Sequence, residues 1–158
     1  MADYSSYIMI DLSGCASALK HTGDSLDHGY WAKGPPASIG AGVVLGPSDP
    51  LNANKGEWPI QAEDNPGPAG SEGWVSFTTD DNSTVTIRFS DSYSADNNYA
   101  GITIDRNPGN RYTLTGYYNS GGDHMGSYMT SMPQSGHPIY CRFVITTVDP
   151  LPRKSAKA

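Results

Sequence analysis

The chain alternates apolar and polar residues with a period of two between residues 73 and 105. The turn residues Asp81-Asn82 and a polar run at 90–98 divide this alternation into three segments. Because successive side chains of a strand point to opposite faces, the pattern predicts three β-strands near 73–79, 83–89 and 99–105. Their shared apolar face consists of Val75, Phe77, Val85, Ile87, Phe89, Ile102 and Ile104.

Further strands are predicted on both sides of this meander, at residues 7–12, 40–45, 57–62, 111–118 and 139–148. In the last of these, Ile139, Cys141, Phe143 and Ile145 share one face. Residues 13–40 are rich in Gly, Ser, Ala, His and Pro, and we expect irregular structure there with at most one helical turn at 16–21. No segment shows a sustained helical period, so the fold class is all-β, an antiparallel β-sandwich.

The length fits one sandwich domain over residues 1–150, and the basic segment 151–158 is expected to be a disordered tail. No apolar run is long enough to cross a bilayer, which predicts no transmembrane segment. The first residues lack the pattern of a signal peptide, so we expect a cytoplasmic location, with non-classical release left open. Cys15 and Cys141 are expected to be two buried thiols, although a disulfide between them remains an alternative.

The formal net charge of −6 argues against nucleic acid as a partner, because binding to phosphates requires a basic face. It equally disfavours electrostatic docking on anionic lipid. Uncharged sugars and zwitterionic headgroups remain as ligand classes.

Tyrosine is the most suggestive residue type for binding. Tyr93 and Tyr99 flank the polar run at 90–98, and Tyr112, Tyr117 and Tyr118 lie on the next strand. Tyrosine rings stack on sugars and attract quaternary ammonium groups, although tyrosine is also a common half-buried strand residue. Trp74 alternates with Val75 and Phe77, so its side chain should face solvent, a ligand or a partner.

Catalytic and metal-binding patterns are weak. The acidic and amide residues between 80 and 98 could hold Ca²⁺, as loops of Ca²⁺-dependent lectins do, but their spacing matches no EF-hand and turn chemistry is favoured. None of the four histidines has metal-ligand spacing. Asp123 and His124 near Ser120 suggest a hydrolase, but no Gly-x-Ser-x-Gly pattern accompanies them. We therefore predict a protein that is not an enzyme and needs no cofactor.

The order of several motifs resembles the actinoporins, the sea-anemone pore-forming cytolysins, and the wider group that includes fungal fruit-body lectins. The motifs are Gly-Pro-Ala-Gly-Ser-Glu-Gly-Trp-Val-Ser-Phe at 67–77, the turn at 81–82, Thr-Ile-Arg-Phe-Ser-Asp-Ser-Tyr at 86–93, and Tyr-Tyr-Asn followed by Gly-Gly-Asp at 117–123. The resemblance covers roughly residues 60–148. A more distant similarity to the aegerolysins is limited to the sandwich and to the Ser-Glu-Gly strand start.

The resemblance implies a choline-headgroup site at Ser90, Ser92, Tyr117 and Tyr118, with Tyr93 and Tyr112 beside it. Three departures shift the expectation. Ser92 stands where the family has proline, the Trp-rich membrane loop is replaced by the sequence at 97–101, and the amphipathic pore-forming helix has no counterpart before the first strand. These differences favour a lectin-like protein over a pore former.

The sequence thus predicts a non-enzymatic cell-surface recognition protein that binds a glycan or a choline-containing lipid. The predicted ligand-binding residues lie along the edge formed by 90–99 and 112–123, namely Ser90, Ser92, Tyr93, Tyr99, Tyr112, Tyr117, Tyr118 and Asp123. The alternatives are a membrane-associating cytolysin or toxin component and a self-assembling structural protein, for which exposed aromatic residues would make homo-oligomer contacts.

Overall fold

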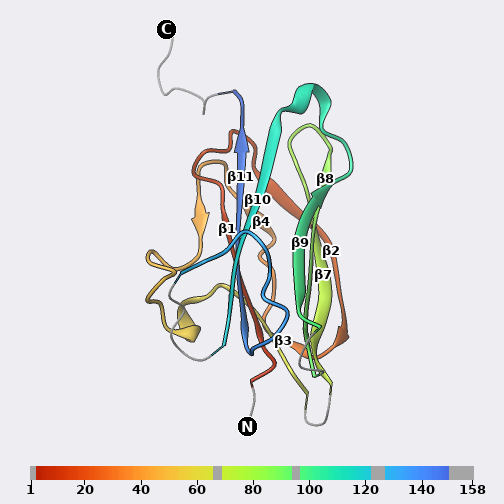
Figure 1. Cartoon of the computed structure of the whole chain (residues 1–158). Coiled ribbons are helices and arrows are strands. Elements are labelled where there is room, and N and C mark those ends of the chain that lie inside the picture. Colours follow the sequence, from red (N-terminus) through yellow and green to blue (C-terminus); the bar gives the residue numbers. More distant parts are fainter. Residues whose placement is uncertain (1–2, 66–68, 94–96, 122–126, 150–158) are drawn as a thin grey trace, which may run out of the picture.

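The computed structural model of the chain describes residues 3–65, 69–93, 97–121 and 127–149. Within these residues, two β-sheets face each other (Figure 1). Apolar side chains from both sheets pack between them. The predicted β-sandwich is therefore confirmed.

Sheet A contains six strands, with β10, β11, β1, β6 and β3 side by side in that order and β5 paired to β1. Their bounds are β1 Ser6–Asp11, β3 Tyr30–Lys33, β5 Val44–Leu45, β6 Ile60–Glu63, β10 Tyr112–Ser120 and β11 Ile139–Thr147. The pairs are antiparallel except for β1 and β11, which run in the same direction. The first and last described strands of the chain therefore lie together at the centre of one sheet.

Sheet B contains five strands in the order β4, β2, β7, β8 and β9, all antiparallel to their neighbours. Their bounds are β2 Leu19–His28, β4 Ser38–Ile39, β7 Gly70–Thr78, β8 Thr84–Ser92 and β9 Tyr99–Ile104. Two short 3-10 helices, η1 Lys55–Glu57 and η2 Pro108–Asn110, lie between strands. The predicted meander is β7–β8–β9, and its first turn places Asn82 at a φ of 64°.

The core lies between the sheets and matches the predicted apolar faces. Val75, Phe77, Val85, Ile87 and Phe89 are all 0% exposed, and Ile102 and Ile104 pack against them from the edge strand. The four predicted inward residues of β11 are also 0% exposed. Cys15 and Cys141 are buried free thiols, as expected, and burial raises the pKa of both.

The expectation for residues 13–40 is wrong. This segment contains β2, β3 and β4, and it has no helical turn at 16–21. The ten residues of β2 are mostly polar and show little alternation, because only Leu19 is fully buried. Pairing with β7 along most of its length, with two register shifts, holds β2 in the sheet. Pairing with a neighbouring strand therefore stabilises β2, although its own sequence lacks the alternation typical of a strand.

The polar run at 90–98 is also shorter than predicted, because β8 continues to Ser92. Ser90 and Asp91 are consequently buried strand residues rather than loop residues.

Candidate ligand-binding site

The outer face of sheet B is formed by the polar and aromatic side chains of β7, β8 and β9. Along β8, Ile87 and Phe89 point into the core while Arg88 between them is exposed on the other face. On β7, Val75 and Phe77 are buried and Trp74 lies on the opposite face, as the alternation predicts. The pattern that builds the core thus also builds this outer face.

Strand pairing arranges the outward side chains in three rows across β9, β8 and β7. The rows are Tyr99–Ser90–Glu72, Gly101–Arg88–Trp74 and Thr103–Thr86–Ser76. Directly opposed residues on paired strands have Cβ atoms about 5 Å apart, so each row forms continuous surface. A hydrogen bond of 2.8 Å between the hydroxyls of Ser76 and Thr86 ties two strands together in the third row.

A hollow of about 180 Å³ opens on the β8–β9 part of this face. It is lined by Thr86, Arg88, Tyr99, Ala100, Gly101 and Thr103. Gly101 helps to create the hollow, because a Cβ atom placed there would have no other atom within 4 Å. The ring of Tyr99, 46% exposed, borders it. Partial burial and nearby Glu72 raise the pKa of Tyr99, so its hydroxyl stays protonated at neutral pH.

Arg88 is the one charged residue among the six that line the hollow. It is exposed and forms no hydrogen bond or ion pair with any residue that the structure describes. Glu72, an acidic residue of β7 in the adjacent row, has its carboxylate 4.0 Å from Nε2 of His28. Arg88 thus has its guanidinium donors available to a ligand.

Trp74 provides a second aromatic ring on the other side of Arg88. Its six-membered ring lies over Gly23 of β2, where an added Cβ atom would be 3.4 Å from Cη2 and Cζ3. Trp74 is partly exposed and directly opposes Arg88 across the β7–β8 pair. Two aromatic side chains, one on each strand next to β8, therefore lie on either side of Arg88.

A separate aromatic cluster lies at the end of the sandwich where β8 finishes. Tyr93 is 54% exposed, and its ring centroid lies 5.5 Å from that of Tyr4. The Tyr4 ring packs edge-on against His137 at 4.4 Å. Nδ1 of His137 contacts Oδ1 of Asp91, an inward-facing residue of β8.

Asp91 is 0% exposed, and its second carboxylate oxygen, Oδ2, has no hydrogen-bond partner among the described residues. Burial raises the pKa of Asp91 to about 9. Burial also lowers the pKa of His137. Both shifts favour uncharged side chains, so the pair is expected to share one proton between Oδ1 and Nδ1.

Tyr112 lies in the interior at the opposite end of β8. It is 3% exposed, and its hydroxyl donates to Oδ1 of Asp81 at 2.9 Å while accepting from Nη1 of Arg111 at 3.0 Å. Arg111 also forms a two-pronged ion pair with Asp149, with distances of 2.8 and 3.0 Å. These contacts fasten the start of β10 to the β7–β8 turn. Tyr112 is therefore placed for stability rather than on the predicted binding edge.

Tyr118 is also an interior residue, 6% exposed, with its ring edge-on to Phe143 at a centroid distance of 5.8 Å. Tyr117 lies on the outer face of sheet A, where the guanidinium of Arg142 is 5.1 Å from its ring centroid. One of the two consecutive tyrosines faces the core and the other does not, as alternation requires. Asp123 lies outside the described residues.

The predicted residues thus separate into distinct places. Ser90 and Tyr99 are direct cross-strand neighbours on sheet B, although Ser90 is only 4% exposed. Ser92 and Tyr93 lie at the end of β8, beside the cluster with Tyr4. The predicted edge does not extend to Tyr112 or Tyr118.

Sequence reasoning missed Arg88, Tyr4 and His137 as neighbours of the predicted tyrosines. Position 88 lies between two inward residues, so the alternation already indicated an outward arginine. No comparable signal existed for Tyr4 and His137, because pairing of β1 with β11 brings their distant segments together.

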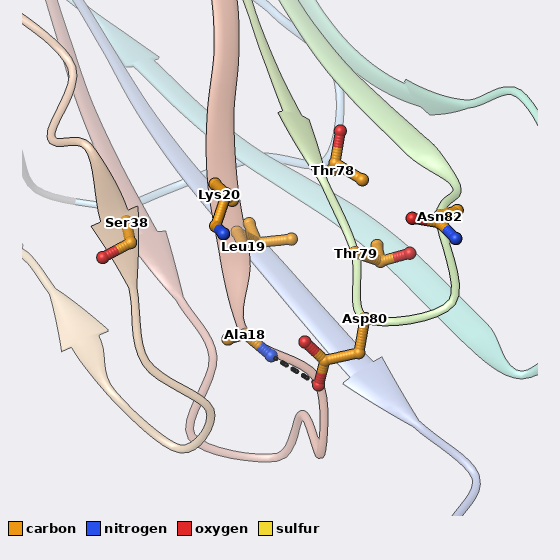
Figure 2. A pocket seen from close by; sticks show the side chains of 8 residues that line it. All are labelled: Ala18, Leu19, Lys20, Ser38, Thr78, Thr79, Asp80 and Asn82. Atoms are coloured by element: carbon orange, nitrogen blue, oxygen red, sulfur yellow. Dashed lines mark hydrogen bonds between the residues drawn. The ribbon is translucent and has the colours of Figure 1, made fainter.

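A larger hollow of about 280 Å³ lies at the β7–β8 turn (Figure 2). Its lining residues are Ala18, Leu19, Lys20, Ser38, Thr78, Thr79, Asp80 and Asn82. The carboxylate of Asp80 accepts a hydrogen bond from the backbone N–H of Ala18 at 3.3 Å, and Thr79 donates to Asp81 at 2.5 Å. No aromatic side chain lines this hollow, and several of its polar groups already hold the turn.

Two further features of the described residues concern metal binding and membrane spanning. They contain no group of three or more His, Cys, Asp or Glu side chains positioned for a metal ion. In the same residues, no helix is both long and apolar enough to span a bilayer.

Comparison of the sequence with known protein families and with curated proteins gives no match. Comparison of the structure does. The chain is similar to RahU, a protein crystallised in complex with a Tris molecule, with a TM-score of 0.57 over 92% of this chain and 96% of that one. It is also similar to the lipid-binding protein Nakanori, with a TM-score of 0.54 over 90% of this chain and 70% of that one. Sequence identity is 10% in both cases, so these similarities establish a shared fold.

Proposed function

We propose that this protein is a non-enzymatic recognition module that binds a glycan through the outer face of sheet B. The observation that carries the proposal is the half-exposed ring of Tyr99 at the border of a hollow that also presents the unpaired guanidinium of Arg88. Aromatic rings stack on the apolar face of a sugar, and adjacent polar groups bond its hydroxyls.

The polar groups around Tyr99 suit such a ligand. Thr86 and Thr103 border the hollow with hydroxyl groups that can both donate and accept hydrogen bonds. All the lining residues belong to β8 and β9, so the sheet holds them in place before a ligand arrives. Little ordering of the protein is then required on binding.

The structural comparisons support a binding role of this general kind. Tris is a small polyhydroxylated amine, and the second similar protein is described as lipid-binding. Neither description names a cytolytic activity, and our proposal does not include one.

The surroundings of His137 differ from those of a catalytic triad histidine. Its partner Asp91 is completely buried, and His137 forms no hydrogen bond to a serine or threonine hydroxyl among the described residues. A catalytic Ser–His–acid arrangement requires that bond.

A second candidate function is the binding of a choline headgroup at the end of the sandwich. The observation that favours it is the pair of rings of Tyr4 and Tyr93, 5.5 Å apart and tilted by 48°. Aromatic rings at an angle can surround a quaternary ammonium through cation–π contacts. The hollow beside Tyr99 suits choline less well, because Arg88 would repel a cation there.

Parallel binding measurements distinguish these functions. Wild-type protein is applied to a glycan array and to choline-lipid vesicles, together with Tyr99→Ala and Tyr93→Ala. The proposal expects glycan binding that Tyr99→Ala abolishes and Tyr93→Ala preserves. Vesicle binding that depends on Tyr93, without glycan binding, would support the second candidate. A mass that rises with protein concentration, with neither ligand bound, would point to self-assembly instead.

A further inference from the structure

We infer that the ligand of the Tyr99 hollow is an acidic sugar, whose carboxylate is bound by Arg88 while its ring stacks on Tyr99. This inference rests on the proposed glycan-binding function and specifies the chemical class of the glycan. It concerns sugars that carry a carboxylate, such as sialic acids and uronic acids.

Arg88 has no hydrogen-bond or ion-pair partner among the described residues. Its guanidinium is charged at every accessible pH, and a charged group on a folded surface is normally paired or fully hydrated. Here the side chain borders a hollow, has no partner among the described residues, and lies beside the aromatic Tyr99. An arginine in this setting offers parallel N–H donors that match the two oxygens of a carboxylate.

The space in front of Arg88 is open. The residue directly opposite Arg88 on β9 is Gly101, so no side chain fills that position on the edge strand. The resulting volume of about 180 Å³ is smaller than a typical ligand pocket, and suits a carboxylate with part of one sugar ring. The rest of the ring would lie on the exposed face of Tyr99.

The charge of the residues that line the hollow also favours an acidic ligand. The chain as a whole carries −6, yet the hollow itself is lined by one cation and no anion. Glu72 on β7 lies one row away, opposite Ser90 rather than Arg88. A neutral sugar offers Arg88 no opposite charge, whereas a carboxylate offers both a charge and two acceptor oxygens.

The test uses glycans with and without a free carboxylate. Wild-type protein is titrated with one oligosaccharide bearing terminal sialic acid, with its desialylated form, and with its carboxylate methyl ester. A uronic acid and the corresponding neutral hexose form a second pair. Because a charge-assisted bond is stronger than a neutral one, we expect the acidic member to bind at least about tenfold more tightly.

Three variants assign that preference to Arg88. Arg88→Gln should remove the preference for the acidic glycan. Arg88→Lys should keep part of this preference, because the positive charge remains without the bidentate geometry. Arg106→Gln is the matched control, since Arg106 is exposed just after β9 but bonds the backbone oxygens of Asp81 and Asn82. Thermal unfolding of each variant verifies the fold.

The outcomes separate the inference from the proposed function. Tyr99-dependent binding with equal affinity for acidic and neutral sugars would overturn the inference and leave the proposed function in place. An acidic preference that Arg88→Gln leaves unchanged would also overturn it. Absence of binding to every glycan would overturn both, and so would binding to anionic vesicles alone.

Discussion

The side chain of His137 contacts the buried carboxylate of Asp91 through Nδ1 and Oδ1, joining the segment before β11 to the end of β8. Asp91 belongs to sheet B and His137 precedes a strand of sheet A, so this contact is one of the links that close the sandwich at that end. Asp91 has no exposed surface, and its pKa of about 9 in the folded protein lies far above the value of 3.8 for an accessible aspartate.

This difference predicts a fall in stability with rising pH. Between about pH 4 and pH 9 the folded chain keeps the Asp91 proton that the unfolded chain has lost, so unfolding releases a proton. The contribution is fully present below the unfolded pKa and is lost as the pH rises through the folded one. His137 acts in the opposite sense, because its lowered pKa reduces stability as the pH falls below 6.5.

The interval from pH 7 to pH 8 isolates the aspartate. There His137 is neutral in both states, and the free energy of unfolding should fall by about 1.4 kcal/mol per pH unit from Asp91. Asp91→Asn should remove that slope, since asparagine does not titrate and can still bond Nδ1 of His137. Chemical denaturation of both proteins at several pH values gives the slopes. Equal slopes would show that Asp91 is already ionised in the folded chain.

The Arg111 network predicts a stability effect without a binding effect. Arg111→Ala should lower the free energy of unfolding by about 1–2 kcal/mol, because it removes the bidentate pair with Asp149 and the bonds to Asp81 and Tyr112. Arg111→Lys should recover part of the loss. Urea denaturation measures both variants, with exposed Arg106→Ala as the control. A loss for Arg106→Ala as large as that for Arg111→Ala would argue against a specific network.

Two glycines provide a matched pair of substitutions. Gly116→Ala should destabilise the fold by about 1–3 kcal/mol, because the new Cβ atom would overlap the hydroxyl oxygen and Cζ of the buried Tyr118. Gly101→Ala meets no atom within 4 Å and should unfold at nearly the wild-type temperature.

The same two substitutions should have the opposite order of effects on glycan binding, with the larger effect at Gly101. Gly101→Ala narrows the hollow beside Tyr99 and should weaken binding, whereas Gly116→Ala should bind normally while folded. Thermal unfolding and glycan titration of both variants test this. Unchanged glycan binding by Gly101→Ala would show that the hollow beside Tyr99 is not the binding site.

The two consecutive tyrosines should respond differently to truncation. Tyr118→Ala opens a cavity in the core and should cost about 3–5 kcal/mol. Tyr117→Ala removes a partly exposed ring beside Arg142 and should cost about 1 kcal/mol or less. Denaturation curves of the single variants provide the comparison. A similar loss for both would contradict the orientation of β10 described above.

Local alternation predicted the strands that bury one apolar face. Val75 and Phe77 on β7, and Ile87 and Phe89 on β8, supply a clear period of two, and the structure buries all four. The strand β2 was missed because its sequence is mostly polar and the strand depends on pairing with β7. Its existence is a property of the sheet rather than of the segment.

Only some of the candidate binding residues could be predicted from the alternation of apolar and polar residues. Tyr99 and the outward direction of Trp74 follow from their positions on strands next to a predicted core face. The interior position of Tyr112 and Tyr118 could have been found from their shared parity with Leu114, the aliphatic residue of that strand. The contacts of Tyr93 with Tyr4, and of Asp91 with His137, join distant segments and leave no local signal.

The most direct test of glycan recognition by the outer face of sheet B is an NMR titration of the backbone amides with a sialylated oligosaccharide. The account predicts that the largest shift changes occur at Arg88, Tyr99 and Gly101, and that Tyr99→Ala abolishes them. Changes centred on Tyr4 and Tyr93, or on Lys20 and Asp80, or no changes at all, would contradict it.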